Sequence, residues 1–178
     1  RSETSWSTIH EILSNTKSQC IKVFDINIRQ HFYNKEIINN SLKYANVFKL
    51  NEDELPIVSN LLGIEGFESK KSTVEILQKL AEEYSLMLIA LTRGYKGSLL
   101  ISGNRVSNHP GFKVKVVDTV GAGDAFTAAV VVGLLNNMNL NSINDFANRV
   151  GSYVCTQEGG TPAGISKLGV RSETSPKN

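Results

Sequence analysis

Short apolar segments alternate with helix-like segments along this chain, and that alternation constrains the fold more than any other feature. Apolar runs at residues 21–25, 47–50 and 86–91 are separated by segments in which apolar residues recur at helical spacing. Strands joined through helices pair in parallel, and the helices cover the faces of the sheet. The pattern predicts an α/β fold with a mostly parallel, doubly wound sheet and helices on both faces.

The second half of the chain adds a hairpin, a strand and two helices to this prediction. Residues 97–101 are expected to pair with the segment that follows Gly103, and the alternating residues 112–117 predict a further strand. Residues 125–135 and 144–154 predict helices. No low-complexity linker divides the chain, so we predict one domain over residues 1–170, followed by a disordered tail at residues 171–178.

Composition excludes several classes of function. The chain has 178 residues, of which 40% are hydrophobic, so it can bury a sizeable core. A net charge of +2 argues against nucleic acid or a membrane surface as partner, and no apolar run approaches the roughly 18 residues of a membrane span. Cys20 and Cys155 lack metal-ligand spacing and are expected to be reduced, which favours a cytoplasmic protein.

Residues 118–126 combine a glycine turn with a carboxylate. The turn contains Gly121 and Gly123 and joins the predicted strand to a helix, and the unpaired N–H groups at a helix start attract phosphate. Asp124 would lie beside the bound anion, where a carboxylate is suited to accept a proton from an attacking hydroxyl. The alternative is an ordinary connection between a strand and a helix.

The same nine residues, Asp-Thr-Val-Gly-Ala-Gly-Asp-Ala-Phe, resemble the C-terminal signature of the ribokinase-like (PfkB) carbohydrate kinases. The resemblance implies transfer of a phosphoryl group from ATP to a sugar hydroxyl, with Asp124 as general base and in contact with the substrate. It further implies that the backbone N–H groups of Gly121, Ala122 and Gly123 stabilise charge on the phosphoryl group.

Residues 25–29, Asp-Ile-Asn-Ile-Arg, resemble the Asp-Pro-Asn-x-Arg element of fructokinase-like members of this family. The resemblance implies that Asn27 and Arg29 face the substrate, although a solvated surface arginine is the alternative for Arg29. Ile26 stands where proline is usual, and a less rigid turn is therefore expected.

Residues 51–54, Asn-Glu-Asp-Glu, are similar to the family's Asn-x-x-Glu motif. The resemblance implies that Asn51 and Glu54 orient Mg²⁺ through water molecules, because that ion gives up its hydration reluctantly. The alternative is a helix start with Asn51 as N-cap and Glu54 at the third helical position.

Other residues are implied to bind the nucleotide or a monovalent cation. Residues 92–97 resemble the family's nucleotide turn, which implies that Thr92 and Gly94 line the path of the triphosphate or the ribose, with an ordinary glycine hairpin as the alternative. Asp118 and the Val120 carbonyl resemble the potassium site of some members, unless Asp118 only caps the turn. The region where members stack adenine corresponds here to Asn148, Gly151, Ser152 and Cys155.

The resemblance covers nearly all of this chain but only the C-terminal part of the family. The first half of such kinases supplies the opening strands, a Gly-Gly sugar motif and a small β lid, so the sugar cannot be identified and the chain alone is expected to lack activity. Implied partners are ATP, a sugar and a second copy in a homodimer of the full-length protein. A non-catalytic nucleotide-binding module and a kinase for a nucleoside or vitamin alcohol stay open as alternatives.

Overall fold

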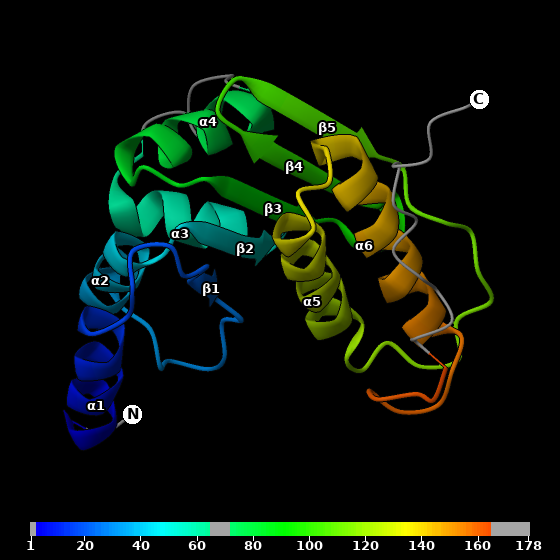
Figure 1. Cartoon of the computed structure of the whole chain (residues 1–178), viewed down its shortest axis with the longest axis horizontal. Helices are drawn as coiled ribbons and strands as arrows, with labels where there is room; N and C mark the ends of the chain where they lie inside the picture. Colours follow the sequence, from blue (N-terminus) through cyan, green and yellow to red (C-terminus); the bar gives the residue numbers. More distant parts are fainter. Residues whose placement is uncertain (1–2, 65–71, 165–178) are drawn as a thin grey trace. The chain divides into compact units, whose positions relative to one another are not determined.

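The computed structural model describes residues 3–64 and 72–164 and contains a five-stranded sheet in the order β1-β2-β3-β4-β5 (Figure 1). β1 and β2 pair in parallel, whereas β4 and β5 are antiparallel, so the sheet is mixed. The predicted α/β class is confirmed. The chain divides into two compact units, Arg1–Ile89 and Ala90–Asn178. The tail predicted at residues 171–178 lies outside the described residues.

The first unit contains four helices and the first strands among its described residues. In chain order these are α1 (Glu3–Ser14), β1 (Val23–Asp25), α2 (Lys35–Tyr44), β2 (Val47–Asn51), α3 (Glu54–Leu62), α4 (Thr73–Glu83) and β3 (Leu88–Thr92), which runs into the second unit. The second unit continues with a short 3₁₀ helix (Gly94–Lys96), β4 (Ser98–Ser102), β5 (Arg105–His109), α5 (Ala122–Leu135) and α6 (Leu140–Cys155).

Strand β2 and helices α2 and α4 form the core of the first unit. Phe48 and Leu50 of β2 are fully buried, and so is Leu42 of α2. Helix α4 begins with a capping box in which the Ser72 and Glu75 side chains bond each other's backbone N–H groups. Local capping and burial of one apolar face therefore act together at α4, as its sequence pattern predicts.

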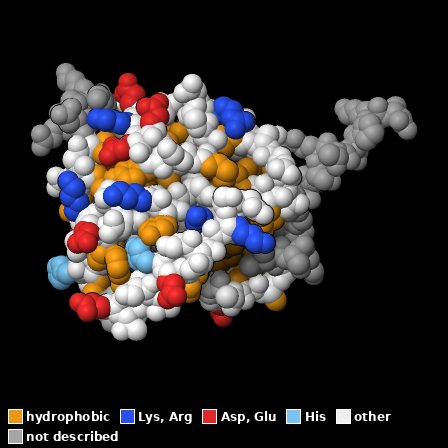
Figure 2. All heavy atoms as spheres, turned by 60° about the vertical axis from the view of Figure 1, so that its left-hand side comes forward, with side chains coloured by type: hydrophobic (Ala, Val, Ile, Leu, Met, Phe, Trp, Pro, Cys, Tyr) orange, Lys and Arg blue, Asp and Glu red, His pale blue; other side chains and the backbone are white. Residues whose placement is uncertain are grey.

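Helix α1 buries none of its residues. Trp6, Ile9 and Ile12 are 45%, 55% and 63% exposed. Hydrophobic side chains also reach the surface among charged ones on the face drawn in Figure 2. These three apolar side chains of α1 thus stay largely exposed in the described part of the chain.

Helices α5 and α6 pack side by side in the second unit (Figure 1), and a glycine permits their close approach. A Cβ atom on Gly133 would lie only 2.8 Å from Cγ1 of Ile143. Both helices are longer than predicted: α5 begins at Ala122, and α6 begins at Leu140, where the Asn139 side chain accepts from the Ser142 N–H. None of the helices that the structure describes combines the length and apolar character needed to cross a membrane.

The strand predicted at residues 112–117 is wrong. These residues form no strand, their side chains are exposed, and the Val117 N–H donates to the Cys155 carbonyl of α6 rather than to a neighbouring strand. Alternating β-branched residues favour an extended backbone, but a strand also requires a partner edge. This segment has none among the described strands.

Candidate functional site

The N-terminus of α5 carries the glycine turn. Gly121 precedes the helix in the left-handed conformation, with φ +76°. The Ala122 N–H donates to the Thr119 carbonyl at 3.3 Å, while the N–H groups of Gly123 and Asp124 meet no acceptor within the described ranges. Unpaired N–H groups and the positive end of a helix dipole together form an anion-binding site.

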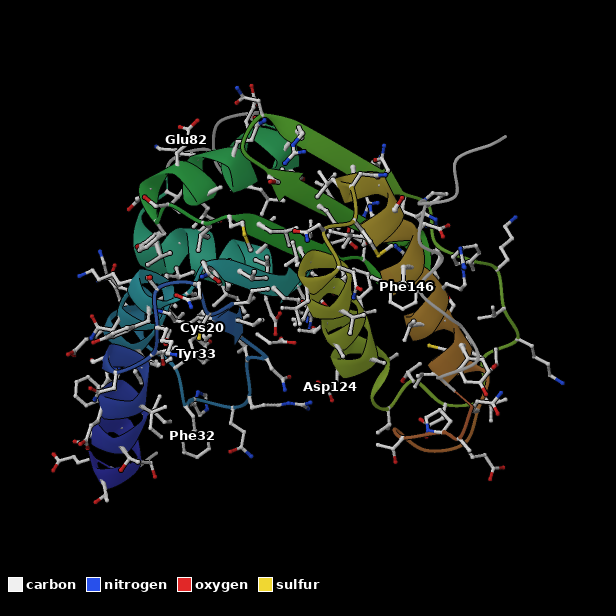
Figure 3. The ribbon with its side chains drawn as sticks, viewed as in Figure 1. Cys20, Phe32, Tyr33, Glu82, Asp124 and Phe146 are labelled. Carbon is white, nitrogen blue, oxygen red and sulfur yellow. The ribbon has the colours of Figure 1, made fainter. Side chains whose placement is uncertain are left out.

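Asp124 lies in the first turn of α5 (Figure 3). Its side chain is exposed, and within residues 3–64 and 72–164 it takes part in no hydrogen bond or ion pair. The carboxylate is therefore free to accept a proton from a group held beside the helix start. The structure thus brings the predicted base and the predicted anion-binding N–H groups together.

Asp118 closes the loop in front of this turn. Its Oδ1 atom accepts from the Val120 N–H at 3.0 Å, and its Oδ2 atom accepts from the Gly159 N–H at 3.2 Å. These backbone hydrogen bonds, with that of Val120 as the larger cause, hold the pKa of Asp118 below its ordinary value of 3.8. Asp118 therefore does cap the turn, and its role at a monovalent cation stays a prediction.

The segment after α6 is a part of this site that the sequence analysis missed. A Cβ atom on Gly121 would lie 2.6 Å from the Cα atom of Gly160, so the two backbones are in direct contact. The pair Gly159 and Gly160, directly after a predicted helix, was the available signal.

Helix α6 supports the glycine turn from the other side. The Cys155 carbonyl accepts from the N–H groups of Val117 at 2.8 Å and Asp118 at 3.3 Å. Gly151 faces the turn, since a Cβ atom there would lie 3.3 Å from the Ala122 carbonyl oxygen. Burial, and secondarily the charge of Asp118, raise the pKa of the Cys155 thiol. Ser152, which follows Gly151 in α6, is half-buried.

The Asn148 side chain is buried and forms hydrogen bonds within the protein. Its side-chain NH₂ group donates to Ser98 Oγ at 2.7 Å and to the Asn144 carbonyl oxygens of side chain and backbone at 3.0 and 2.8 Å. Asn144 in turn donates to the Ser107 hydroxyl of β5 at 3.1 Å. This buried network joins α6 to the β4–β5 hairpin, and a nucleotide contact at Asn148 stays a prediction.

The predicted nucleotide turn follows β3. Thr92 is the last residue of the strand, and Gly94, with φ +56°, begins the 3₁₀ helix. The Arg93 N–H donates to the Gly97 carbonyl at 2.8 Å, and a Cβ atom on Gly97 would lie 2.1 Å from the His109 carbonyl oxygen. This geometry agrees with the alternative of an ordinary glycine hairpin. A nucleotide contact at Thr92 and Gly94 stays a prediction.

In the first unit, Asn51 and Glu54 bond each other reciprocally. The Asn51 Oδ1 atom accepts from the Glu54 N–H at 2.9 Å, and Glu54 Oε2 accepts from the Asn51 N–H at 2.7 Å. These are the reciprocal hydrogen bonds of a capping box, so they support the alternative in which Asn51 caps a helix start, although the regular part of α3 begins at Glu54. The Asn51 Oδ1 atom also accepts from the Asp53 N–H at 2.9 Å, across the turn that residues 52 and 53 form before the helix.

The loop that is predicted to face the substrate starts beside an ion pair that the sequence analysis missed. Asp25 and Lys49 are register partners on β1 and β2, and Lys49 Nζ lies 3.1 Å from Asp25 Oδ1. Lys49 is only 8% exposed, and a lysine within the apolar run of residues 47–50 was the available signal. Asn27, with φ +39°, and Arg29 are both exposed.

The predicted site residues thus form two groups, one in each unit. No group of three or more His, Cys, Asp or Glu side chains in the described residues could hold a metal ion. Residues 2–167 match the pfkB family carbohydrate kinases. The chain belongs to the PfkB family. The family signature at residues 118–126 is therefore the segment that forms the start of α5.

Two relatives illustrate the similarity to named kinases. A putative sugar kinase of Pyrococcus horikoshii is 31% identical over 160 residues, which are 85% of this chain and 46% of the relative. The fructokinase of Escherichia coli is 29% identical over 151 residues, or 79% of this chain and 46% of that enzyme. The chain spans about half the length of these relatives.

Solved structures of similar kinases share the fold. The Pyrococcus horikoshii sugar kinase in complex with ATP gives a TM-score of 0.71 at 29% identity, with 89% of this chain and 49% of that chain covered. A double mutant of the Vibrio cholerae O395 fructokinase, with fructose, ADP and potassium ion bound, gives a TM-score of 0.71 at 22% identity. There, 93% of this chain and 53% of that chain are covered.

Proposed function

We propose that the protein containing this chain is a fructokinase-like kinase that transfers a phosphoryl group from ATP to a sugar hydroxyl. The observation that carries the proposal is the start of α5, where unpaired backbone N–H groups and the exposed Asp124 carboxylate occupy one turn. Family membership and the named activities of the sugar kinase and fructokinase relatives support it.

In this proposal Asp124 accepts the proton of the sugar hydroxyl while the hydroxyl oxygen bonds to the γ-phosphorus and the bond to ADP breaks. Such general base catalysis contributes roughly 10²- to 10⁴-fold in rate. Backbone N–H groups of the turn, at Gly121, Ala122 and Gly123, stabilise the charge on the phosphoryl group. The Gly121 and Gly123 groups are better suited than that of Ala122, whose N–H already has a partner in Thr119.

Two ions belong to the proposal. Mg²⁺ neutralises charge on the ATP phosphates, with Asn51 and Glu54 orienting its water ligands. The described residues fit such an ion because they offer carboxylate and amide oxygens at this point but no closed cluster of metal-binding side chains, so phosphate and water would supply most of the ligands. Asp118 and the Val120 carbonyl are proposed for potassium, supported by the potassium bound to the Vibrio cholerae enzyme.

The remaining assignments concern substrates and assembly. Asn27 and Arg29 would contact the sugar, and Thr92 and Gly94 would line the triphosphate. The adenine ring of ATP would contact Asn148 Oδ1, Gly151, Ser152 and Cys155. A cytoplasmic location is proposed and is supported by the two free cysteines, and the full-length protein is proposed to form a homodimer.

The test is an assay of the full-length gene product with ATP, Mg²⁺ and a panel of hexoses, pentoses, nucleosides and vitamin alcohols. The proposal expects turnover with a hexose that exceeds turnover with every nucleoside and vitamin alcohol. Preference for one of these would select the alternative kinase class, and ATP binding without transfer would select a non-catalytic module. Residues 1–178 alone should bind nucleotide weakly and transfer nothing, since in-line attack needs the acceptor held in place by the rest of the site.

A further inference from the structure

The loop that carries Asn27 and Arg29 is held by neighbouring elements of the first unit. Asp25, the last residue of β1 before the loop, pairs with Lys49, and the Ile26 N–H donates to the Lys49 carbonyl at 3.2 Å. Further along, the Ile28 N–H donates to Glu54 Oε1 at 2.8 Å. The loop is therefore attached both to β2 and to the first residue of α3.

Glu54 connects two backbone segments through one carboxylate. Oε1 accepts from Ile28, and Oε2 accepts from the Asn51 N–H at 2.7 Å. The side chain is buried, at 5% exposure. Hydrogen bonds to an ionised acceptor are roughly twice as strong as neutral ones, and burial raises the cost of breaking them. This carboxylate thus fixes the distance between the loop and the end of β2.

We propose that Glu54 is a positioning residue that holds the loop of residues 26–29 in the conformation that presents Asn27 and Arg29 to the phosphoryl acceptor. The acceptor role of the loop rests on the proposed function, whereas the fixing of the loop rests on the two hydrogen bonds alone. Any water-mediated contact of Glu54 with Mg²⁺ would come in addition.

The conformation of the loop explains why it must be held. Asn27 adopts φ +39° and Gln30 adopts φ +52°, and the left-handed region is strained for residues other than glycine. Such backbone persists only where surrounding contacts determine it, and the contacts here are those of Ile28 and Ile26 together with the Phe32 N–H, which donates to the Arg29 carbonyl at 3.3 Å.

These contacts also replace the proline that is usual at position 26. A proline would restrict φ but could not donate the hydrogen bond that Ile26 makes to the Lys49 carbonyl. In this chain the rigidity of the turn therefore comes from hydrogen bonds to β2 and Glu54.

Amide hydrogen exchange in the 178-residue chain, followed by NMR, tests the positioning role without relying on activity. Three variants are compared: Glu54→Gln, Glu54→Asp and the control Asp53→Asn. Glutamine offers a single acceptor oxygen, and aspartate keeps the charge on a side chain shorter by one bond of about 1.5 Å. Asp53 is exposed, is the neighbouring residue, and makes no capping hydrogen bond, so its variant removes the same charge without touching the loop.

We expect the Ile28 amide to exchange at least about tenfold faster in Glu54→Asp, and the Ile28 or the Asn51 amide to do so in Glu54→Gln, whose single oxygen can accept from only one of them. Both amides should keep their exchange rates in Asp53→Asn, and buried amides of β2 and α4 should keep theirs in every variant. Unchanged exchange of both the Ile28 and the Asn51 amides in a folded Glu54→Gln protein would overturn the proposal. If Glu54→Gln does not fold, Glu54→Asp decides by the same criterion.

Kinetics of the full-length protein test the consequence for the acceptor. The expected result is a KM for the sugar at least about tenfold higher in Glu54→Asp, with the KM for ATP changed less. A raised Mg²⁺ requirement with unaltered sugar KM would overturn the acceptor role. If the wild type transfers to no sugar, the proposed function fails, whereas the exchange rate of Ile28 still decides whether Glu54 holds the loop.

Discussion

Gly121 and Gly160 lie backbone against backbone, at a distance that leaves no room for a side chain: a Cβ atom on Gly121 would lie 2.6 Å from the Gly160 Cα atom and 2.6 Å from its carbonyl oxygen. Gly121 also has φ +76°, which disfavours other residues. The start of α5 therefore requires glycine for two independent reasons, and one of them comes from a segment beyond α6.

Gly121→Ala should destabilise the protein more than Gly63→Ala, a matched glycine variant. Gly63 has a similar φ of +71°, but no atom lies within 4 Å of the position that its Cβ would take, so Gly63→Ala should cost only the left-handed strain, about 1–2 kcal/mol. Gly121→Ala should cost about 1–3 kcal/mol more, because the Gly160 backbone must move. Denaturant unfolding of both variants measures this difference in the free energy of unfolding. Equal decreases would show that the Gly160 backbone moves away from Gly121 at no cost.

Asp124→Asn in the full-length protein should abolish phosphoryl transfer and leave ATP binding nearly intact. The amide is similar in shape but cannot accept the proton, so kcat should fall by roughly 10²-fold or more. Steady-state kinetics and ATP titration check the two parts, with Asp53→Asn as a control that should keep both. A variant that retained more than about a tenth of wild-type turnover would rule out Asp124 as the base.

Ser98→Ala should destabilise the second unit through the buried network. The Ser98 hydroxyl is fully buried, donates to Asn144 Oδ1 at 2.5 Å and accepts from Asn148 at 2.7 Å. Its removal should lower the free energy of unfolding by about 1–2 kcal/mol. The exposed Ser7→Ala should change it by less than about 0.5 kcal/mol. Similar values for both serines would show that the network adds little.

The Asp118 carboxylate should make stability depend on pH on the acid side. Its pKa in the folded protein is lowered below 3.8 by hydrogen bonds from the Val120 and Gly159 backbone, so its contribution is fully present above pH 3.8 and is lost as the pH falls through the lowered folded value. The stability difference between wild type and Asp118→Asn, from unfolding curves at several pH values, should shrink below pH 3.8. A difference that stays constant down to the lowest pH would contradict this origin.

Local chemistry accounts for what the sequence predicted correctly. The reciprocal hydrogen bonds of Asn51 and Glu54 lie within one helical turn, and the glycine turn and Asp124 are consecutive in the chain, so each could be recognised without knowledge of distant residues. The strand prediction at residues 112–117 failed because it depended on residues far away in the chain. Alternation there indicated an extended backbone, but whether a strand forms depends on a partner edge elsewhere.

The sequence by itself thus determined the α/β class, most helices and strands, and the family through the signature at residues 118–126. Only the tertiary structure decided that Glu54 bonds to Ile28, that Gly160 touches Gly121 and that Asn148 is held by Ser98. The physical reason is the separation in sequence between the residues that make contact. Helix caps and glycine turns are set by neighbours in the chain, whereas these contacts join backbone and side chains that are brought together only when strands pair and helices pack.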